Sequence, residues 1–528
     1  MKSALPVEVL MTKRRACSWM KLLAAALSVC GCAGSATGSR EAVPTPRALA
    51  PETATPEPSI SDRYWRAGAA YSFPARLSYP TGTGVITTLH VPGALDTTGH
   101  PFFTPLGENG RACITCHQPA DGMSLSARTA QEVWEKLGPS DPLFAAGDGS
   151  NCPSLPQHER ASHSLLLDRG LFRIARPWPP LDRDGRPIEP ELDIELVSDP
   201  TGCNADPAFG LSSAKPAISV FRRPRPVANL KFATSMGFSF DPKDGLPLEI
   251  DRESGLPTSG NLLADDRERT LLGQARDALQ SHTDHHGTLP SAELQRIITF
   301  ESQIYTAVSE HVRAGALDEG GASGGPDALS RAPAGKLQST KSNPIWGEFS
   351  AWNAADSDPQ GEFRRSVARG AAIFTGRQFL VSDSAGITDV GFGNPVRNSC
   401  AFCHNMLHAG MDVAPGQVDL GTTNLPHANP LPELPLFRLT CRPGARAHPH
   451  LGRVVLTHDP GYALTTGKCI DIGKITAQSL RGIAARPPYF VNGSAATLAD
   501  VIAFYDKRYE MKLSDEEKLD LQHLLEVL

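Results

Sequence analysis

The same five-residue pattern, C-x-x-C-H, occurs twice in this chain, at residues 113–117 and 400–404. It is the attachment signature of c-type haem, in which two thiols bond to the porphyrin vinyl groups and the next histidine becomes the proximal iron ligand. We therefore expect two covalently bound haem c groups. A zinc site or a redox-active C-x-x-C is the alternative, but neither predicts a second copy of the whole pattern. The expected thiol donors and proximal iron ligands are Cys113, Cys116, Cys400, Cys403, His117 and His404.

A chain of 528 residues is too long for one ordinary hydrophobic core, so the two motifs predict two haem domains. A Gly-rich stretch at 315–340 is typical of a flexible linker, which places the domains at 61–314 and 341–528. The expected fold is mainly α, with two cytochrome c-like helical domains and long irregular loop insertions. Helices are expected at residues 126–137, 265–281, 291–312 and 362–374, and in a C-terminal pair that begins at the capping boxes of Thr497 and Ser514.

The first 32 residues have the pattern of an export signal, because basic residues up to Lys21 precede a short apolar run at 22–29. The run is too short to span a bilayer in the mature protein. Residues 29–33 resemble a lipoprotein cleavage box with Cys32 as the lipidated residue, and a plain signal peptide is the alternative. The Ala- and Pro-rich segment 33–60 is typical of a disordered tether. We expect a periplasmic protein that contacts the membrane through a lipid anchor or not at all.

The cysteine count also indicates an exported protein. Of 11 cysteines, three lie in the signal region and four attach haem, which leaves one pair after each haem motif. An oxidising compartment would join these pairs, and four reduced thiols are the alternative that fits a cytosolic protein. The expected disulfides are Cys152–Cys203 and Cys441–Cys469.

Charge excludes one class of partner. The net charge of −6 and a pI near 6.3 provide no basic surface for nucleic acid. A group of three histidines, His282, His285 and His286, surrounds Asp284 and has the composition of a metal site. Because the group lies in a polar turn between two expected helices, a solvated surface is the favoured interpretation.

Three segments resemble one protein family. Residues 369–374, the second C-x-x-C-H motif and residues 479–498 are similar to the bacterial di-haem cytochrome c peroxidases and to their relative that matures a tryptophan-derived quinone cofactor. Much of 140–262 is extra or only loosely similar to the family. The resemblance implies an oxidoreductase that reduces hydrogen peroxide at the first haem with electrons from an external donor, such as a small cytochrome or a cupredoxin. A non-catalytic electron-transfer cytochrome and a protein-modifying di-haem oxidase stay open as alternatives.

The resemblance also implies a ligand for the second haem. In the family, that ligand lies fourteen residues after the histidine of a Pro-Tyr-Phe-His string, and it is a methionine in the peroxidases and a tyrosine in the quinone-maturing relative. Here Val491 replaces the histidine, and the count reaches Tyr505, which is expected as an iron ligand or else as a core aromatic of its helix. Several family members hold Ca²⁺ between the haems through backbone carbonyls near Pro488, and Arg486 replaces the usual threonine there.

The first haem has no obvious sixth ligand. The family's displaceable histidine corresponds to Val133, and Met123 is either a ligand or a packing residue. An iron without such a partner is open to peroxide, whose cleavage requires a general base and an electrostatic stabiliser. The nearby candidates for these roles are Gln118, Glu132 and Arg128. The family's inter-haem tryptophan is not visible, and the residues that could replace it, or that are core or loop anchors instead, are Trp134, Trp178 and Trp346.

Overall fold

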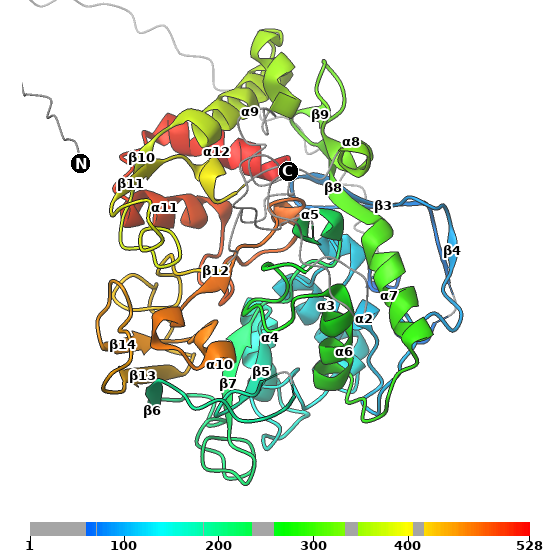
Figure 1. Cartoon of the computed structure of the whole chain (residues 1–528). Helices are drawn as coiled ribbons and strands as arrows, with labels where there is room; N and C mark the ends of the chain where they lie inside the picture. The colour runs from blue at the N-terminus through cyan, green and yellow to red at the C-terminus, as the bar shows by residue number, and fades with distance from the viewer. Residues whose placement is uncertain (1–59, 70, 183, 235–257, 333–346, 405–416) are drawn as a thin grey trace, which may run out of the picture. The chain divides into compact units, whose positions relative to one another are not determined.

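The computed structural model describes residues 60–69, 71–182, 184–234, 258–332, 347–404 and 417–528 (Figure 1). The expected export signal and nearly all of the expected tether lie outside these ranges. Of the described residues, 32% are helical and 18% lie in strands, which form several small sheets. The prediction of a mainly α fold with two cytochrome c-like helical domains is therefore wrong. All described residues belong to one unit, Pro56–Leu528, and the division into two haem domains stays a prediction.

A four-stranded antiparallel sheet shows where the helix prediction failed. Helix α7 (Ser291–Gln303) ends where β8 (Ile304–His311) begins, although apolar periodicity predicted one helix as far as 312. The run Ile-Tyr-Thr-Ala-Val that opens β8 is buried at every position and rich in β-branched and aromatic residues, which favour a strand. The other members of the sheet, in the order β2-β3-β8-β9, are β2 (Arg76–Pro80), β3 (Gly84–His90) and β9 (Gly315–Ala316).

The segment expected as a linker begins with regular structure. Strand β9 pairs with β8, and helix α8 (Gly325–Arg331) packs against β8. Residues 333–346 lie outside the described ranges.

Three helices of the C-terminal half, α9 (Pro359–Gly376), α11 (Leu498–Arg508) and α12 (Asp515–Glu526), pack together (Figure 1). Both predicted capping boxes are present, because Thr497 and Ser514 each bond the backbone of a residue three positions on. The buried Asp520 of α12 accepts hydrogen bonds from Ser366 and Arg369 of α9, which fixes how the two helices meet.

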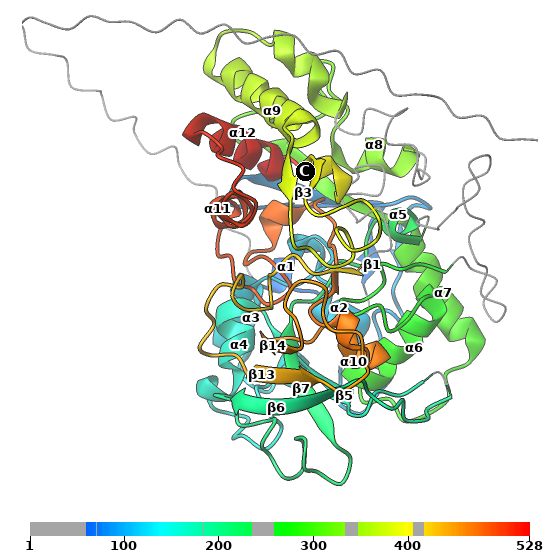
Figure 2. The same ribbon diagram turned by 60° about the vertical axis from the view of Figure 1, so that its left-hand side comes forward.

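The described part of residues 140–262 contributes three strands to a second β region. Strand β5 (Phe172–Pro177) pairs with β7 (Ala217–Arg222). Strand β6 (Leu192–Ser198) pairs with β13 (Leu436–Cys441), which in turn pairs with β14 (Val454–Thr457) (Figure 2). The insertion therefore shares a sheet with the C-terminal half of the chain.

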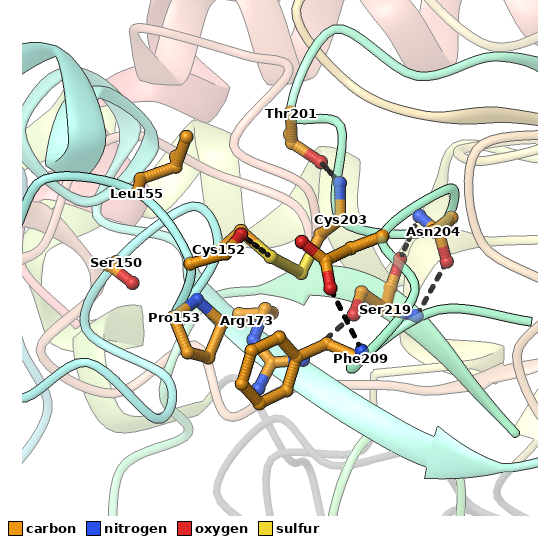
Figure 3. Close-up of a disulfide and its surroundings, with 12 residues drawn as sticks. Ser150, Cys152, Pro153, Leu155, Arg173, Thr201, Cys203, Asn204, Phe209 and Ser219 are labelled. Carbon is orange, nitrogen blue, oxygen red and sulfur yellow. Dashed lines mark hydrogen bonds between the residues drawn. A yellow bond between two sulfur atoms is a disulfide. The ribbon is translucent and has the colours of Figure 1, made fainter. Parts of the chain in front are cut away.

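Both expected disulfides are confirmed. Cys152 is bonded to Cys203 and Cys441 to Cys469, with Cα–Cα distances of 5.2 Å and 5.8 Å. The first bond lies beside the β5–β7 pair, where Arg173 of β5 donates to Ser219 of β7 at 2.9 Å (Figure 3).

The other helices and strands complete the fold. The helices are α1 (Ile60–Arg63), α2 (Cys113–Cys116), α3 (Ala127–Leu137), α4 (Ser164–Arg169), α5 (Leu230–Thr234), α6 (Leu271–His282) and α10 (Ala463–Thr466). The strands are β1 (Ser72–Phe73), β4 (Leu95–Asp96), β10 (Phe379–Val381), β11 (Val396–Asn398), β12 (Gln417–Val418) and β15 (Ile475–Thr476). In the described part of the chain, no helix has the length and apolar character needed to cross a membrane.

Candidate haem sites

The first C-x-x-C-H motif lies in the wall of a large cavity. Cys113, Cys116 and His117 line it from α2, and residues of α6 and α7 form part of the remaining wall. The space between the walls is about 1290 Å³, counting the part that opens to solvent. Neither cysteine is in a disulfide, which leaves both thiols for attachment.

His117 is oriented as a metal ligand would be. Its Nδ1 lies 3.2 Å from the backbone carbonyl oxygen of Met123, and because a carbonyl only accepts, Nδ1 must carry the proton. Burial lowers the pKa of His117 to about 4, so the ring is neutral at pH 7 and Nε2 keeps its lone pair. A ligating histidine characteristically donates its other ring nitrogen in this way. The Met123 side chain packs in an apolar cluster and does not line the cavity, which favours the packing role.

The other residues expected around the first haem lie elsewhere. Gln118 is buried and bonds the backbone of Trp65 and Ile114. Glu132 of helix α3 pairs with Arg63 of α1 and with Arg128 of its own helix, and Val133 packs in a separate apolar cluster. None of these candidates lines the cavity. Their nearness in sequence to His117 therefore did not place them at the cavity.

Instead, the cavity contains a histidine–aspartate pair that sequence reasoning missed. His282, the last residue of α6, lines the cavity, and its Nδ1 lies 2.6 Å from Oδ2 of Asp148. Asp148 also pairs with Arg111. Burial and then the charge of Arg267 lower the pKa of His282 to about 4, so the ring is neutral. Since Nδ1 donates to the carboxylate, the lone pair of Nε2 is left for the cavity.

Asp148 comes from the insertion, which holds it firmly. The backbone N–H of Arg173 on β5 donates to the Asp148 carbonyl at 2.9 Å, and the Arg173 guanidinium donates to Gly147 at 2.6 Å. Gly149 allows the loop to lie close, because a Cβ atom there would be 2.5 Å from the carbonyl oxygen of Leu143. The disulfide of Cys152 follows three residues later.

The other histidines of the predicted group lie apart from His282. The imidazole of His285 bonds the Leu106 carbonyl through Nδ1. His286 lies with Asp284 and Glu108 at the surface, where their ligand atoms are within 4.8 Å of one another and all three residues are exposed. The solvated interpretation fits His286 and Asp284, and it does not fit His282.

A buried carboxyl group is the second feature that the sequence did not reveal. Glu301, near the end of α7, is 2% exposed and lines the same cavity, and its Oε2 has no hydrogen-bond partner among the described residues. Burial raises the pKa of Glu301 to about 8, so the carboxyl is mostly protonated at pH 7.

Replacement of Glu301 by glutamine should flatten the pH dependence of stability. The unfolded carboxyl titrates near pH 4.3, so between that pH and about 8 the unfolded chain binds fewer protons than the folded protein. Raising the pH through this window therefore destabilises the wild type by up to about 1.4 kcal/mol per pH unit from this group. Urea unfolding should show that the free energy of unfolding falls less between pH 5 and pH 8 in Glu301→Gln than in the wild type. An equal fall in the two proteins would contradict the assignment of a raised pKa to Glu301.

Part of the second motif lines another cavity, of about 980 Å³ counted in the same way, and Cys400 is not among its lining residues. Cys403 and His404 contribute to one part of its wall, and residues 475–491, which carry most of the family-like string, form another. Tyr505 of α11 lines the same cavity, and its ring lies 6.0 Å from that of Phe490 and 6.3 Å from that of Tyr509. The structure thus brings His404 and Tyr505 to one cavity, as ligation by both requires.

Ligation by Tyr505 predicts a specific spectroscopic change. In the haem-loaded protein, Tyr505→Phe should alter the absorption of one haem and raise its reduction potential, because a phenolate favours the ferric state. Tyr509→Phe is the matched control, since Tyr509 bonds Ser384 and does not line the cavity. Identical spectra of both variants and the wild type would assign Tyr505 to the core instead.

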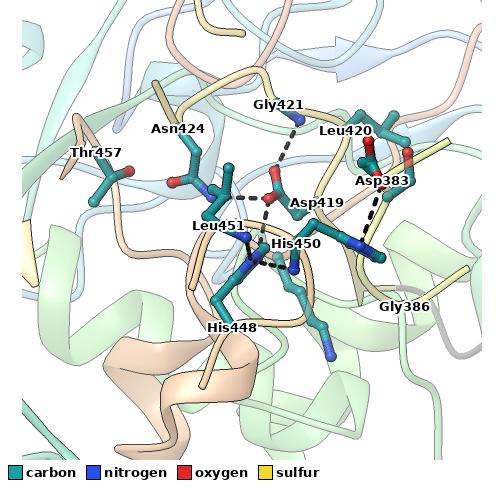
Figure 4. A network of polar contacts seen from close by, with 12 residues as sticks. Asp383, Gly386, Asp419, Leu420, Gly421, Asn424, His448, His450, Leu451 and Thr457 are labelled. Carbon is teal, nitrogen blue, oxygen red and sulfur yellow. Dashed lines mark hydrogen bonds and ion pairs between the residues drawn. The ribbon is translucent and has the colours of Figure 1, made fainter. Parts of the chain in front are cut away.

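A polar network supports the wall of the second cavity. Val418 and Leu420 line it, and Asp419 between them turns inward to accept from the N–H of Gly421 at 2.8 Å and from Asn424 at 2.9 Å (Figure 4). His448 pairs with the same carboxylate at 3.2 Å. Val491, at the position of the family histidine, packs in an apolar cluster with Ala264 and Ile475.

The two cavities share part of their walls. Arg223 and Pro224 line both of them. Trp134 and Trp178 lie in apolar clusters, and no tryptophan among the described residues lines either cavity. Trp346 lies outside the described ranges. The expected inter-haem indole is therefore not supplied by the two described candidates.

Comparison with known proteins gives a partial match. A curated protein of similar sequence is the cytochrome-c peroxidase IdrP1 of Denitromonas iodatirespirans, which is 29% identical over 195 residues. The match covers 34% of this chain and 44% of that protein, so the chain spans less than half of the relative's length. No family model matches, and no solved structure matches. The similarity supports a haem-containing, peroxidase-like oxidoreductase in general terms.

Proposed function

We propose that the protein is an exported di-haem c-type cytochrome that reduces hydrogen peroxide with electrons from an external donor, such as a small cytochrome or a cupredoxin. The observation that carries the proposal is a pair of cavities, one lined by Cys113, Cys116 and His117 and the other by Cys403 and His404. The similarity to a cytochrome-c peroxidase supports the same class of reaction. The two disulfides support maturation in an oxidising compartment such as the periplasm.

The residues of the first cavity have different roles in the proposed reaction. The bound haem iron supplies the centre at which peroxide accepts electrons. His117 would hold the iron through Nε2, because Nδ1 is bonded to the Met123 carbonyl. His282 takes a proton from peroxide at Nε2 and returns it to the departing oxygen, while Asp148 fixes the ring through Nδ1. Reduction of one peroxide to two waters uses two electrons from the donor and two protons.

The second cavity fits an electron-transfer role. If His404 and Tyr505 both bind iron, that haem has no open position and passes electrons only. The donor would then deliver electrons to the second haem, and the shared wall at Arg223 and Pro224 would separate it from the first.

The test is turnover by the full-length protein matured with the c-type haem assembly machinery. Mass spectrometry should show two added haems, and peroxide should oxidise a reduced small cytochrome only when the protein is present. A ferric spectrum with two low-spin haems and no turnover would indicate an electron-transfer cytochrome instead. Oxidation of residues in a partner protein without donor turnover would indicate a protein-modifying oxidase.

A further inference from the structure

Two buried arginines lie at the boundary between the haem cavities. Arg223 lines both cavities and Arg486 lines the second. Arg223 is 5% exposed and Arg486 is 4% exposed. Removing a guanidinium from water costs several kcal/mol unless a counter-charge and hydrogen bonds compensate. The partners of these two side chains therefore indicate what the site is built to bind.

The hydrogen-bond partners of both arginines are backbone carbonyls. Arg223 donates from Nη2 to the carbonyls of Leu125 at 2.7 Å and Arg486 at 3.0 Å. Arg486 donates from Nη1 to the Arg481 carbonyl at 2.7 Å and from Nη2 to that of Ser479. Within the described ranges, neither arginine forms an ion pair with a carboxylate.

The neighbouring Arg222 shows the contrast. It is equally buried but is paired with Asp265 at 2.6 Å and with Asp459 at 2.7 Å. The chain thus neutralises one buried arginine of this segment with its own carboxylates and leaves the next one without a bonded anion.

The charges near the pair do not neutralise it. Burial and the charge of Arg486 lower the pKa of Arg223 to about 10, and burial lowers that of Arg486 to about 10, so both remain charged at pH 7. Asp121 acts on Arg223 from nearby, but its oxygens accept from the N–H and hydroxyl of Ser126. Two positive charges therefore lie together without a bonded carboxylate.

We propose that Arg223 and Arg486 bind propionate carboxylates of the two haems and act as a permanent positive charge between them. The proposal rests on the proposed function, because it requires both haems to be attached. Haem brings two carboxylates into its cavity, and the forked guanidinium is the side chain best suited to bind them. Since Arg223 borders both cavities, its charge acts on both haems, whereas Arg486 acts mainly on the second.

The same pair disagrees with the calcium ion that the family resemblance implies near Pro488. Ca²⁺ requires six to eight oxygen ligands, and here the Arg486 carbonyl already accepts from the cationic Arg223. Two adjacent guanidiniums repel a divalent cation. Arginine charge thus takes the place of the metal ion at this boundary.

The test measures the reduction potentials of the two haems separately by spectroelectrochemistry, in protein shown by mass spectrometry to hold both. A nearby positive charge stabilises the reduced haem, so its loss lowers the potential. Arg486→Gln should lower the potential of the second haem, and Arg223→Gln should lower both. Arg364→Gln is the control, because the Arg364 side chain is 13% exposed, bonds the Ala314 carbonyl, pairs with Glu319 and lines neither cavity. Treatment of the wild type with EDTA should change neither potential.

Unchanged potentials in both glutamine variants would overturn the proposal, and so would bound calcium whose removal shifts the potentials. If a glutamine variant fails to retain both haems, Arg223→Lys and Arg486→Lys keep the charge and should hold both haems near wild-type potentials. Lysine variants with potentials that depart from those of the wild type would contradict the role of charge. A wild type without two haems would refute the proposed function instead, so the two failures are distinguishable.

Discussion

Replacement of His282 by alanine is expected to slow peroxide reduction by the haem-loaded protein by about 10²–10⁴-fold, which is the usual contribution of a positioned general acid–base group. The physical reason is the pair with Asp148, which leaves Nε2 of a neutral ring as a proton acceptor in the first cavity. The measurement is the steady-state rate with a reduced small cytochrome as donor, accompanied by the ferric absorption spectrum.

Two further variants make this result specific. Asp148→Asn should lower the rate by about 10–100-fold, because the ring loses the carboxylate that orients it. His286→Ala should leave the rate unchanged, since His286 lies four residues away but is exposed. A change from low-spin to high-spin iron in His282→Ala would show instead that His282 is an iron ligand. An unaffected rate would exclude a role in proton transfer.

Features that depend on a few adjacent residues, or on the number of cysteines, could be predicted from the sequence. Both histidines of the C-x-x-C-H motifs line a cavity, and the division of the remaining cysteines into two pairs gave both disulfides. The capping boxes at Thr497 and Ser514 were also found correctly, because a cap depends on residues only three positions apart.

Features that depend on tertiary packing were not accessible. The periodicity of the run after Gln303 fitted a helix, but the segment pairs with β3 at the centre of a sheet, so pairing and burial decided its conformation. The same limitation affected the site. The sequence predicted that His282 lies in a solvated polar turn, and only the placement of Asp148, 134 residues earlier, reveals that it faces a cavity.

Sequence distance also misled the search for catalytic groups. Gln118, Glu132 and Arg128 follow the first motif closely, yet none lines the cavity, whereas His282 and Asp148 come from remote segments. Glu301 also lines the cavity from a distant part of the chain. A single buried glutamate at the end of an amphipathic helix has no local signature. Its environment is set by the residues that surround it in space.

The largest expected loss of stability follows removal of the Cys152–Cys203 disulfide. The two cysteines are 51 residues apart, and the loop-entropy relation gives a destabilisation of about 4 kcal/mol for Cys152→Ser combined with Cys203→Ser. The free energy of unfolding of the haem-loaded protein would be measured in urea, with and without the bond.

Removal of the Cys441–Cys469 disulfide provides a matched control, because its shorter separation of 28 residues predicts a similar loss, about 3.5 kcal/mol. The two disulfide variants should differ in their rate of peroxide reduction at urea concentrations below the unfolding transition. The loop that carries Asp148 ends at Cys152, so opening the first disulfide should also slow the reaction by loosening the Asp148–His282 pair. Opening the second should reduce stability and leave the rate unchanged. Equal rates in the two variants would mean that the β5–β7 contacts of Arg173 position Asp148 without help from the disulfide.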